Sequence, residues 1–256
     1  MTSEEALKSL GVSADLLTND ERSRLDAQGS LRLGQVLEPE EVAAMRDLLD
    51  ELAETEGEKA GSELHQEDGA IRLANLLDKG SIFEKCLVTP RVLAGVSHVL
   101  GTSIQLSSLS SRAPLPGQGQ QGLHNDWPVE DDSREYQVCN AAWLLDDCGE
   151  ENGGTRFVPA SHLLWQNPQD VLEDPEADHP DQVNMTGKAG DVVIFNSHLW
   201  HGGALNNSDR QRHIVLSYFT RVGSAYIQND HKTLLRDSTK ARMSKEALAL
   251  ASAMEE

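Results

Sequence analysis

Two short stretches, far apart in the chain, most constrain how it can fold. The stretch 121–127 carries His124 and Asp126 two positions apart, and the stretch 196–203 carries His201. Alternate residues of an extended strand point to the same face, so His124 and Asp126 would lie side by side. Two histidines and one carboxylate are the facial ligand set of non-haem Fe(II) oxygenases. If the fold brings the two stretches together, these three side chains predict a metal site.

A second histidine–aspartate pair competes with the first. His179 and Asp181 have the same spacing, but Pro180 separates them within the acidic stretch 173–181. Proline cannot donate to a strand ladder, which argues against a regular central strand at that point. We therefore expect this second pair to lie in a solvent-exposed loop.

The third ligand also has a rival, because His198 lies close to His201 in the same stretch. Arg212 follows His201 by eleven positions and begins an apolar stretch that is typical of a buried strand. A guanidinium at the start of such a strand is suited to bind a carboxylate through two parallel hydrogen bonds. The same spacing from His198 leads to Asp209, which would repel a carboxylate. His201 is therefore the favoured ligand.

Three separated blocks of the sequence resemble the signatures of the phytanoyl-CoA dioxygenase family in order and spacing: 124–126, 152–162 and 201–212. The resemblance implies a non-haem Fe(II)/2-oxoglutarate-dependent dioxygenase on a double-stranded β-helix, a jelly-roll like that of the cupins. Such an enzyme uses O2 and 2-oxoglutarate to oxidise a small organic molecule, for example a secondary metabolite, and releases succinate and CO2. Halogenating relatives lack the carboxylate, so the presence of Asp126 favours hydroxylation or a related oxidation.

The resemblance also implies roles for individual residues. His124, Asp126 and His201 would be the catalytic residues that hold the iron. Arg212 is charged at any working pH and would bind the far carboxylate of 2-oxoglutarate. Gln121 precedes the first pair of ligands and is expected to border the pocket.

Trp143 and Ser208 are the remaining candidates for contact with the co-substrate. Trp143 occupies a long predicted strand where relatives place an aromatic side chain in the pocket, although packing between sheets would also explain it. Ser208 matches the family pattern but lies in a predicted turn, where hydroxyls commonly cap their own backbone. Gly203 stands where some relatives carry a hydroxyl that helps to hold the co-substrate, so that contact must be absent or replaced here.

The order of the predicted elements indicates one mainly β domain, 1–256, with helical additions. Residues 1–103 are expected to be a helical part that packs on the core, with a Gly- and Glu-rich loop at 55–70 that could border the active site. From 104 to 222, short extended stretches separated by turn signals predict a sandwich or barrel. The resemblance identifies this part as the double-stranded β-helix. Residues 223–256 are expected to form a C-terminal helical tail.

Two helices are predicted with particular clarity in the N-terminal part. Apolar side chains recur at helical spacing in 39–54, and Pro39 is suited to the first turn of a helix. The second helix is expected between Thr89, as its N-cap, and Gly101, as its stop.

Composition narrows the partners and the compartment. The net charge of −20 argues against binding to nucleic acid or to anionic membrane surfaces, because both need a basic protein face. Three cysteines without a CxxC pair indicate a reducing compartment. The first residues are acidic and no apolar stretch approaches the roughly 20 residues that a membrane helix needs. We therefore expect a cytoplasmic protein with a small-molecule substrate.

Two other functions remain compatible with the same residues. A metal enzyme of the cupin type that does not use 2-oxoglutarate would keep the three ligands but have no role for Arg212. A non-catalytic binding protein on the same fold would have no use for the complete ligand set. The sequence does not name the substrate, because fatty acyl chains, amino acids, compatible solutes and secondary metabolites all occur in the family.

Overall fold

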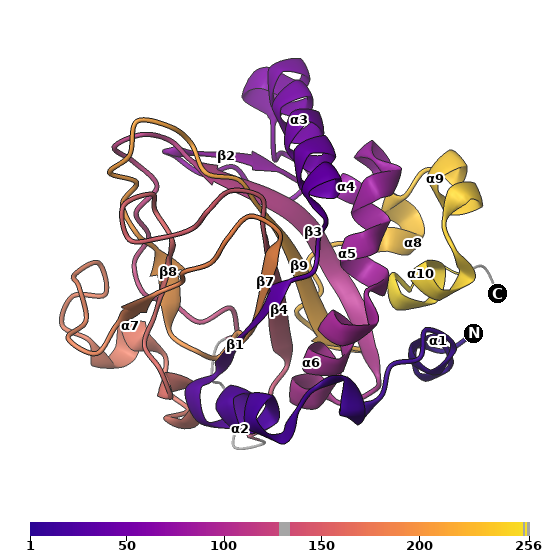
Figure 1. The fold of residues 1–256 in the computed structure, drawn as a ribbon, viewed down its shortest axis with the longest axis horizontal. Coiled ribbons are helices and arrows are strands. Elements are labelled where there is room, and N and C mark those ends of the chain that lie inside the picture. Colours follow the sequence, from indigo (N-terminus) through magenta and orange to yellow (C-terminus); the bar gives the residue numbers. More distant parts are fainter. Residues whose placement is uncertain (128–133, 253, 255–256) are drawn as a thin grey trace.

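Two antiparallel sheets form the framework of the molecule, and most of the helices lie along one side of the larger sheet (Figure 1). The structure is a computed structural model that describes residues 1–127, 134–252 and 254. The larger sheet has six strands in the order β1-β7-β4-β9-β3-β2, and the smaller has three in the order β6-β5-β8. The strands are β1 Ser30–Gln35, β2 Ala70–Leu73, β3 Ile104–Pro114, β4 Val138–Leu144, β5 Thr155–Phe157, β6 Val183–Asn184, β7 Asp191–Asn196, β8 His201–Gly203 and β9 Ile214–Arg221.

The sheet order confirms the predicted jelly-roll with helical additions. Strands that are neighbours in a sheet are rarely neighbours in the chain, as expected when the chain crosses repeatedly between two sheets. The helices are α1 Ser3–Ser9, α2 Asn19–Gln28, α3 Pro39–Glu56, α4 Leu76–Lys79, α5 Lys85–Val88, α6 Pro90–Leu100, α7 Pro168–Val171, α8 His231–Leu234, α9 Asp237–Arg242 and α10 Lys245–Leu250. Short 3-10 turns join them at Ala14–Leu16, Gly57–Lys59, Ser81–Glu84 and Ser161–Leu163.

Both clearly predicted helices are present. Helix α3 begins at Pro39, and Glu41 closes a capping box with the backbone of Glu38. Helix α6 begins after Thr89 and ends at Gly101, which adopts a φ of +83° that favours glycine. No helix among the described residues is both long enough and apolar enough to cross a membrane.

The C-terminal tail forms three short helices where one was expected. Arg236 and Ser244, in extended conformation, separate α8 from α9 and α9 from α10. The side chain of Ser244 accepts a hydrogen bond from the backbone N–H of Ala247 and so starts a new helix. Of these three helices, α10 packs against α1 and α5 (Figure 1).

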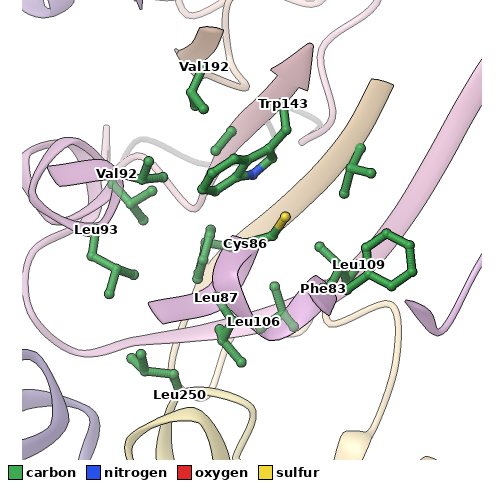
Figure 2. Close-up of a cluster of buried hydrophobic side chains, with 14 of the residues drawn as sticks. Phe83, Cys86, Leu87, Val92, Leu93, Leu106, Leu109, Trp143, Val192 and Leu250 are labelled. Carbon is green, nitrogen blue, oxygen red and sulfur yellow. The ribbon is translucent and has the colours of Figure 1, made fainter. Parts of the chain in front are cut away.

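The main hydrophobic core fills the space between the larger sheet and the helices. Figure 2 shows Trp143 of β4 among side chains from α5, α6 and β7, including Cys86, Val92 and Val192. Trp143 is fully buried, and its indole N–H donates to the hydroxyl of Ser217 over 3.0 Å. A buried indole needs such a partner, because an unpaired buried donor costs free energy. All three cysteines are buried and free of disulfide bonds.

The approach of α6 to the larger sheet depends on a glycine. A Cβ atom at Gly95 would lie 2.2 Å from Cδ1 of Ile194 on β7. Alanine normally stabilises a helix interior by up to about 1 kcal/mol over glycine, so its helix propensity and its overlap with Ile194 oppose each other here. Ile194 is itself fully buried and cannot move without disturbing the core.

We expect the steric overlap with Ile194 to outweigh the gain in helix propensity. Gly95→Ala should destabilise the protein by about 1–3 kcal/mol, the usual cost of overpacking a core, measured by urea unfolding. Adding Ile194→Val removes the overlapping methyl group, so Gly95→Ala should cost less in that background. A Gly95→Ala variant as stable as the wild type would contradict this account of the packing.

Candidate metal centre

The structure brings together the three side chains that the sequence singled out as metal ligands. One ligand atom from each of His124, Asp126 and His201 lies within 4.8 Å of the other two. The Nε2 atom of His124 is 3.8 Å from Oδ1 of Asp126, and Nε2 of His201 is 3.6 Å from Oδ2. Two imidazole nitrogens and a carboxylate thus converge on one point, as a single ion requires.

The backbone positions the two histidines by a direct pairing of their segments. The N–H of each residue donates to the carbonyl oxygen of the other over 2.8 Å, an isolated bridge between His124 and His201. Residues 121–127 are otherwise not a strand, so the expectation of a regular strand there is wrong. Beyond the bridge, the N–H of Asp126 donates to the carbonyl of Ser197 over 2.9 Å instead, which turns the carboxylate toward the imidazoles.

Both rings are held in the tautomer that a metal needs. Nδ1 of His124 lies 2.9 Å from the carbonyl oxygen of Gly122, and Nδ1 of His201 lies 2.7 Å from that of Leu199. A carbonyl can only accept, so each Nδ1 carries a proton and, in the neutral ring, Nε2 has the lone pair that binds an ion. The pair at His179 lies in a partly exposed loop, as expected, and is not part of this cluster.

A buried amide holds the carboxylate ligand. Nδ2 of Asn140, on β4, donates to Oδ2 of Asp126 over 2.7 Å and to the hydroxyl of Ser197 over 2.9 Å. The hydroxyl of Tyr218 donates to the backbone carbonyl of Asp126 over 3.2 Å. Sequence reasoning left Asn140 without a role, although an amide in an otherwise apolar central strand is itself a signal of a buried polar partner.

Charge and burial set the protonation of the cluster. Burial, helped by the neighbouring His201, lowers the pKa of His124 to about 4, so its ring is neutral near pH 7. Burial alone would raise the pKa of Asp126, but His201 and the hydrogen bonds it receives lower it to about 2. Burial also opposes charge on His201, yet the Asp126 carboxylate raises the pKa of that ring. A metal cation bound between His201 and Asp126 would replace that ring proton as the positive charge beside the carboxylate.

A cavity of about 100 Å³ opens beside the ligands. Its wall combines side chains from the larger sheet with others from the N-terminal part of the chain, including Leu64 and His65 in the loop that was expected to border the site. Most of the lining residues have polar side chains, but apolar atoms contribute about half of the wall. The lining residues are Leu64, His65, Arg72, Ser108, Ser110, Arg112, Gln121, His124, Asp126, Asn140, Thr155, Phe195, His201, Ile214, Leu216, Tyr218 and Gln228.

Of the four predicted co-substrate contacts, Gln121 lies in the cavity wall. Its Oε1 accepts a hydrogen bond from the backbone N–H of Gly203 over 3.0 Å. Trp143 does not line the cavity, because it faces the opposite side of β4 from Asn140 and packs in the main core. Ser208 also lies elsewhere, since its hydroxyl donates to Oδ1 of Asn206 within its own turn. We drop both from the set of binding residues.

Arg212 is buried on the cavity side of the sheet. It lies two residues before Ile214, the first cavity-lining residue of β9, and so falls on the same face. Its Nε donates to the carbonyl of Asn152 over 3.1 Å and its Nη2 to that of Gly153 over 2.7 Å. Its Nη1 is buried without a hydrogen-bond partner. An orphaned cationic donor in this position is what a bound carboxylate would satisfy.

Sequence reasoning missed two arginines of the cavity wall. Arg72 of β2 and Arg112 of β3 share the carboxylate of Glu67, with Nε of Arg72 at 2.7 Å and Nη2 of Arg112 at 2.6 Å from its oxygens. In a chain of net charge −20, the buried Arg112 and the largely buried Arg72 beside one cavity are a local reversal of sign. Neither arginine stands in a motif, and only the strand pairing of β2 with β3 brings them together.

The fold and the site define a class: jelly-roll proteins that hold a metal ion with two histidines and an aspartate. Comparison with known proteins then gives the family. The family model described as "Phytanoyl-CoA dioxygenase (PhyH)" matches residues 25–214, and the chain belongs to this family. The prediction of the family is thereby confirmed.

Several named relatives share this similarity. The chain is 27% identical to dioxygenase af480 of Aspergillus fumigatus over 186 residues, which cover 70% of this chain and 59% of that protein. It is 29% identical to the ectoine dioxygenase of Bordetella bronchiseptica over 242 residues, 83% of this chain and 78% of the relative. The chain spans less than two thirds of the length of two fungal relatives. It covers 59% of dioxygenase af480 and 56% of dioxygenase cnsJ of Penicillium expansum.

Solved structures share the fold. HygX from Streptomyces hygroscopicus, with nickel and 2-oxoglutarate bound, has a TM-score of 0.64 at 18% identity, covering 81% of this chain and 88% of its own. SnoK, a carbocyclase from nogalamycin biosynthesis that depends on alpha-ketoglutarate, has a TM-score of 0.65 at 21% identity, covering 91% and 93%. At these identities the similarity supports the architecture alone.

The contact from Asn140 to Asp126 predicts a loss of metal affinity. Asn140→Ala should weaken binding of Fe(II), titrated without oxygen, by roughly 10- to 100-fold, the usual cost of losing a partner that orients a ligand. Asn207→Ala is the matched control, because that asparagine is exposed in a turn. If Asn140→Ala binds Fe(II) as tightly as the control, the amide does not orient the carboxylate.

Proposed function

We propose that this protein is an Fe(II)/2-oxoglutarate-dependent dioxygenase that oxidises, by hydroxylation, a small organic molecule and releases succinate and CO2. The observation that carries the proposal is the convergence of His124, Asp126 and His201, with both Nε2 atoms turned toward one point. Three protein ligands leave about half of an octahedral shell open for the co-substrate and oxygen.

The residues divide the work between the metal and the co-substrate. His124, Asp126 and His201 would hold Fe(II), and Gly122, Leu199 and Asn140 would keep them oriented through hydrogen bonds. When bound, Fe(II) with 2-oxoglutarate and O2 supplies the oxidising power.

Two further residues would serve the co-substrate. Arg212 would bind its far carboxylate, because the guanidinium has one donor nitrogen without a partner. Gln121 would border it in the cavity wall.

Arg212 also separates the leading proposal from its two alternatives. A metal enzyme that does not use 2-oxoglutarate would gain nothing from a buried guanidinium with an orphaned Nη1, which costs stability when nothing pairs with it. A non-catalytic binding protein would not need a complete ligand set held in one tautomer. The proposal therefore accounts for more of the buried polar groups than either alternative does.

The relatives' names support a small-molecule substrate for this chain. They include an ectoine dioxygenase and enzymes of nogalamycin biosynthesis, and the cavity wall offers both polar and apolar side chains to a small organic molecule. A cytoplasmic location, without nucleic-acid or membrane partners, remains our inference from the free cysteines and the net charge of −20.

Anaerobic titration tests the proposal directly. Fe(II) and 2-oxoglutarate together should give the wild-type protein the weak visible charge-transfer band of their chelate. Arg212→Met should raise the dissociation constant for 2-oxoglutarate roughly tenfold or more, because it removes a charge-assisted partner of the far carboxylate. The neighbouring exposed Arg210→Met is the matched control and should leave that constant unchanged.

A second variant tests the metal ligands independently of the co-substrate. His124→Ala should abolish the band and reduce the iron that the purified protein retains, because a facial set with one ligand missing binds Fe(II) weakly. Wild-type protein that gives no band with Fe(II) and 2-oxoglutarate would rule out the proposed function.

A further inference from the structure

We propose that Arg112 and Arg212 form one two-arginine subsite for a carboxylate, and that Gly203 has no side chain because Arg112 occupies that space. The carboxylate is the far one of 2-oxoglutarate, so the inference rests on the proposed function. It adds a second guanidinium to Arg212 and explains why the hydroxyl found in some relatives is missing here.

Arg112 keeps one donor nitrogen free beside the cavity. Its Nε lies 3.0 and 3.1 Å from the two oxygens of Glu67, and its Nη2 lies 2.6 Å from Oε1 of Glu67 and 2.6 Å from the carbonyl of Gly119. Within the part of the chain that the structure describes, Nη1 has no partner. The side chain is 5% exposed and lines the cavity, so Nη1 is available to a molecule bound there.

The guanidinium of Arg112 packs directly against Gly203. A Cβ atom at Gly203 would lie 2.8 Å from Nη1 and 2.9 Å from Nη2 of Arg112, and 2.8 Å from the carbonyl oxygen of Gly119. Real side chains do not approach so closely, so no residue with a Cβ fits beside this guanidinium without displacing it. The absence of a side chain at Gly203 on β8 therefore leaves space for the guanidinium of Arg112 from β3 and for the carbonyl of Gly119.

Arg212 lies near the same part of the cavity wall as Arg112 and Gly203. Its Nη2 donates to the carbonyl of Gly153, two residues before Thr155, and Thr155 pairs with Gly203 across the smaller sheet. Thr155 lines the cavity beside Arg112. Burial lowers the pKa of Arg212, and the positive charge of Arg112 lowers it further. The two guanidinium groups are thus electrostatic neighbours, and each has an Nη1 without a partner.

Among the described residues, Arg212 has no carboxylate in contact with it. Arg72, Arg112 and Arg212 are buried or nearly so; Glu67 touches the first two, whereas Asp126 and Asp146 act on Arg72 and Arg212 only through space. Glu67 pairs with Arg72 and Arg112, whereas Arg212 has only carbonyl oxygens as partners. Buried like charges repel strongly in a medium of low dielectric constant. A carboxylate that accepts from both free Nη1 atoms would satisfy two donors and offset the repulsion.

The test compares two keto acids that differ only at the far end. Arg112→Gln keeps an amide donor for Glu67 but removes the guanidinium. In the Fe(II) protein without oxygen, it should raise the dissociation constant for 2-oxoglutarate roughly tenfold, read from the chelate band. Binding of 2-oxobutyrate, which has the same keto-acid end and no far carboxylate, should be unchanged. Arg32→Gln, at an exposed surface ion pair, is the matched control.

A double-mutant cycle tests the role of Gly203. Gly203→Ala should weaken 2-oxoglutarate binding in the wild type by displacing Arg112, and should weaken it less in the Arg112→Gln background, where two of the three close contacts are gone. Equal effects in both backgrounds would show that Gly203 does not make room for Arg112.

The outcomes separate this inference from the proposed function. Wild-type affinity for 2-oxoglutarate in a folded Arg112→Gln protein, or an equal loss for both keto acids, would overturn the subsite while leaving the dioxygenase intact. If Arg112→Gln does not fold, Arg112→Lys serves, because one ammonium group cannot replace the guanidinium at both Glu67 and the co-substrate. Lack of 2-oxoglutarate binding by the wild type would instead reject the proposed function.

Discussion

The reciprocal pair of backbone hydrogen bonds between His124 and His201 is the contact on which the rest of the site depends. It joins an irregular segment to the start of β8 and fixes both imidazoles side by side, with ring centroids 4.4 Å apart. Backbone bonds of this kind do not depend on side-chain identity, so the sequence around them can vary while the ligand geometry is kept. Asp126 then needs only one further backbone bond, to Ser197, to complete the set.

Two of the buried side-chain atoms that have no hydrogen-bond partner lie in or next to the cavity wall. Oδ1 of Asn140 and Nη1 of Arg212 are buried without partners, and both residues belong to the wall or its immediate support. Folded proteins rarely leave such atoms unsatisfied, because each costs roughly 1–3 kcal/mol. Here the cost is understandable if ligands supply the missing contacts, which is why these atoms are more informative than the size of the cavity.

Much of this could be predicted from the sequence, because the signals were local or came in fixed spacing. The helices at 39–54 and 89–101 follow from periodicity and capping, and the ligand set follows from three blocks in order. Trp143 could not be placed, because a strand with both faces buried gives no alternation of polar and apolar residues to reveal which face meets the cavity. Arg112 could not be found, because its role arises from the pairing of β3 with β2 and from a glycine on another sheet.

The position of β1 and β2 has a consequence for how the chain can be divided. These strands come from the N-terminal part but form the two outer edges of the larger sheet. Removing that part would leave β7 and β3 with unpaired backbone groups along their length, a template for association with other chains. It would also strip the cavity of Leu64, His65 and Arg72. A truncated core would therefore tend to aggregate, so the first hundred residues are as much a part of the folded unit that forms the cavity as the strands of the core are.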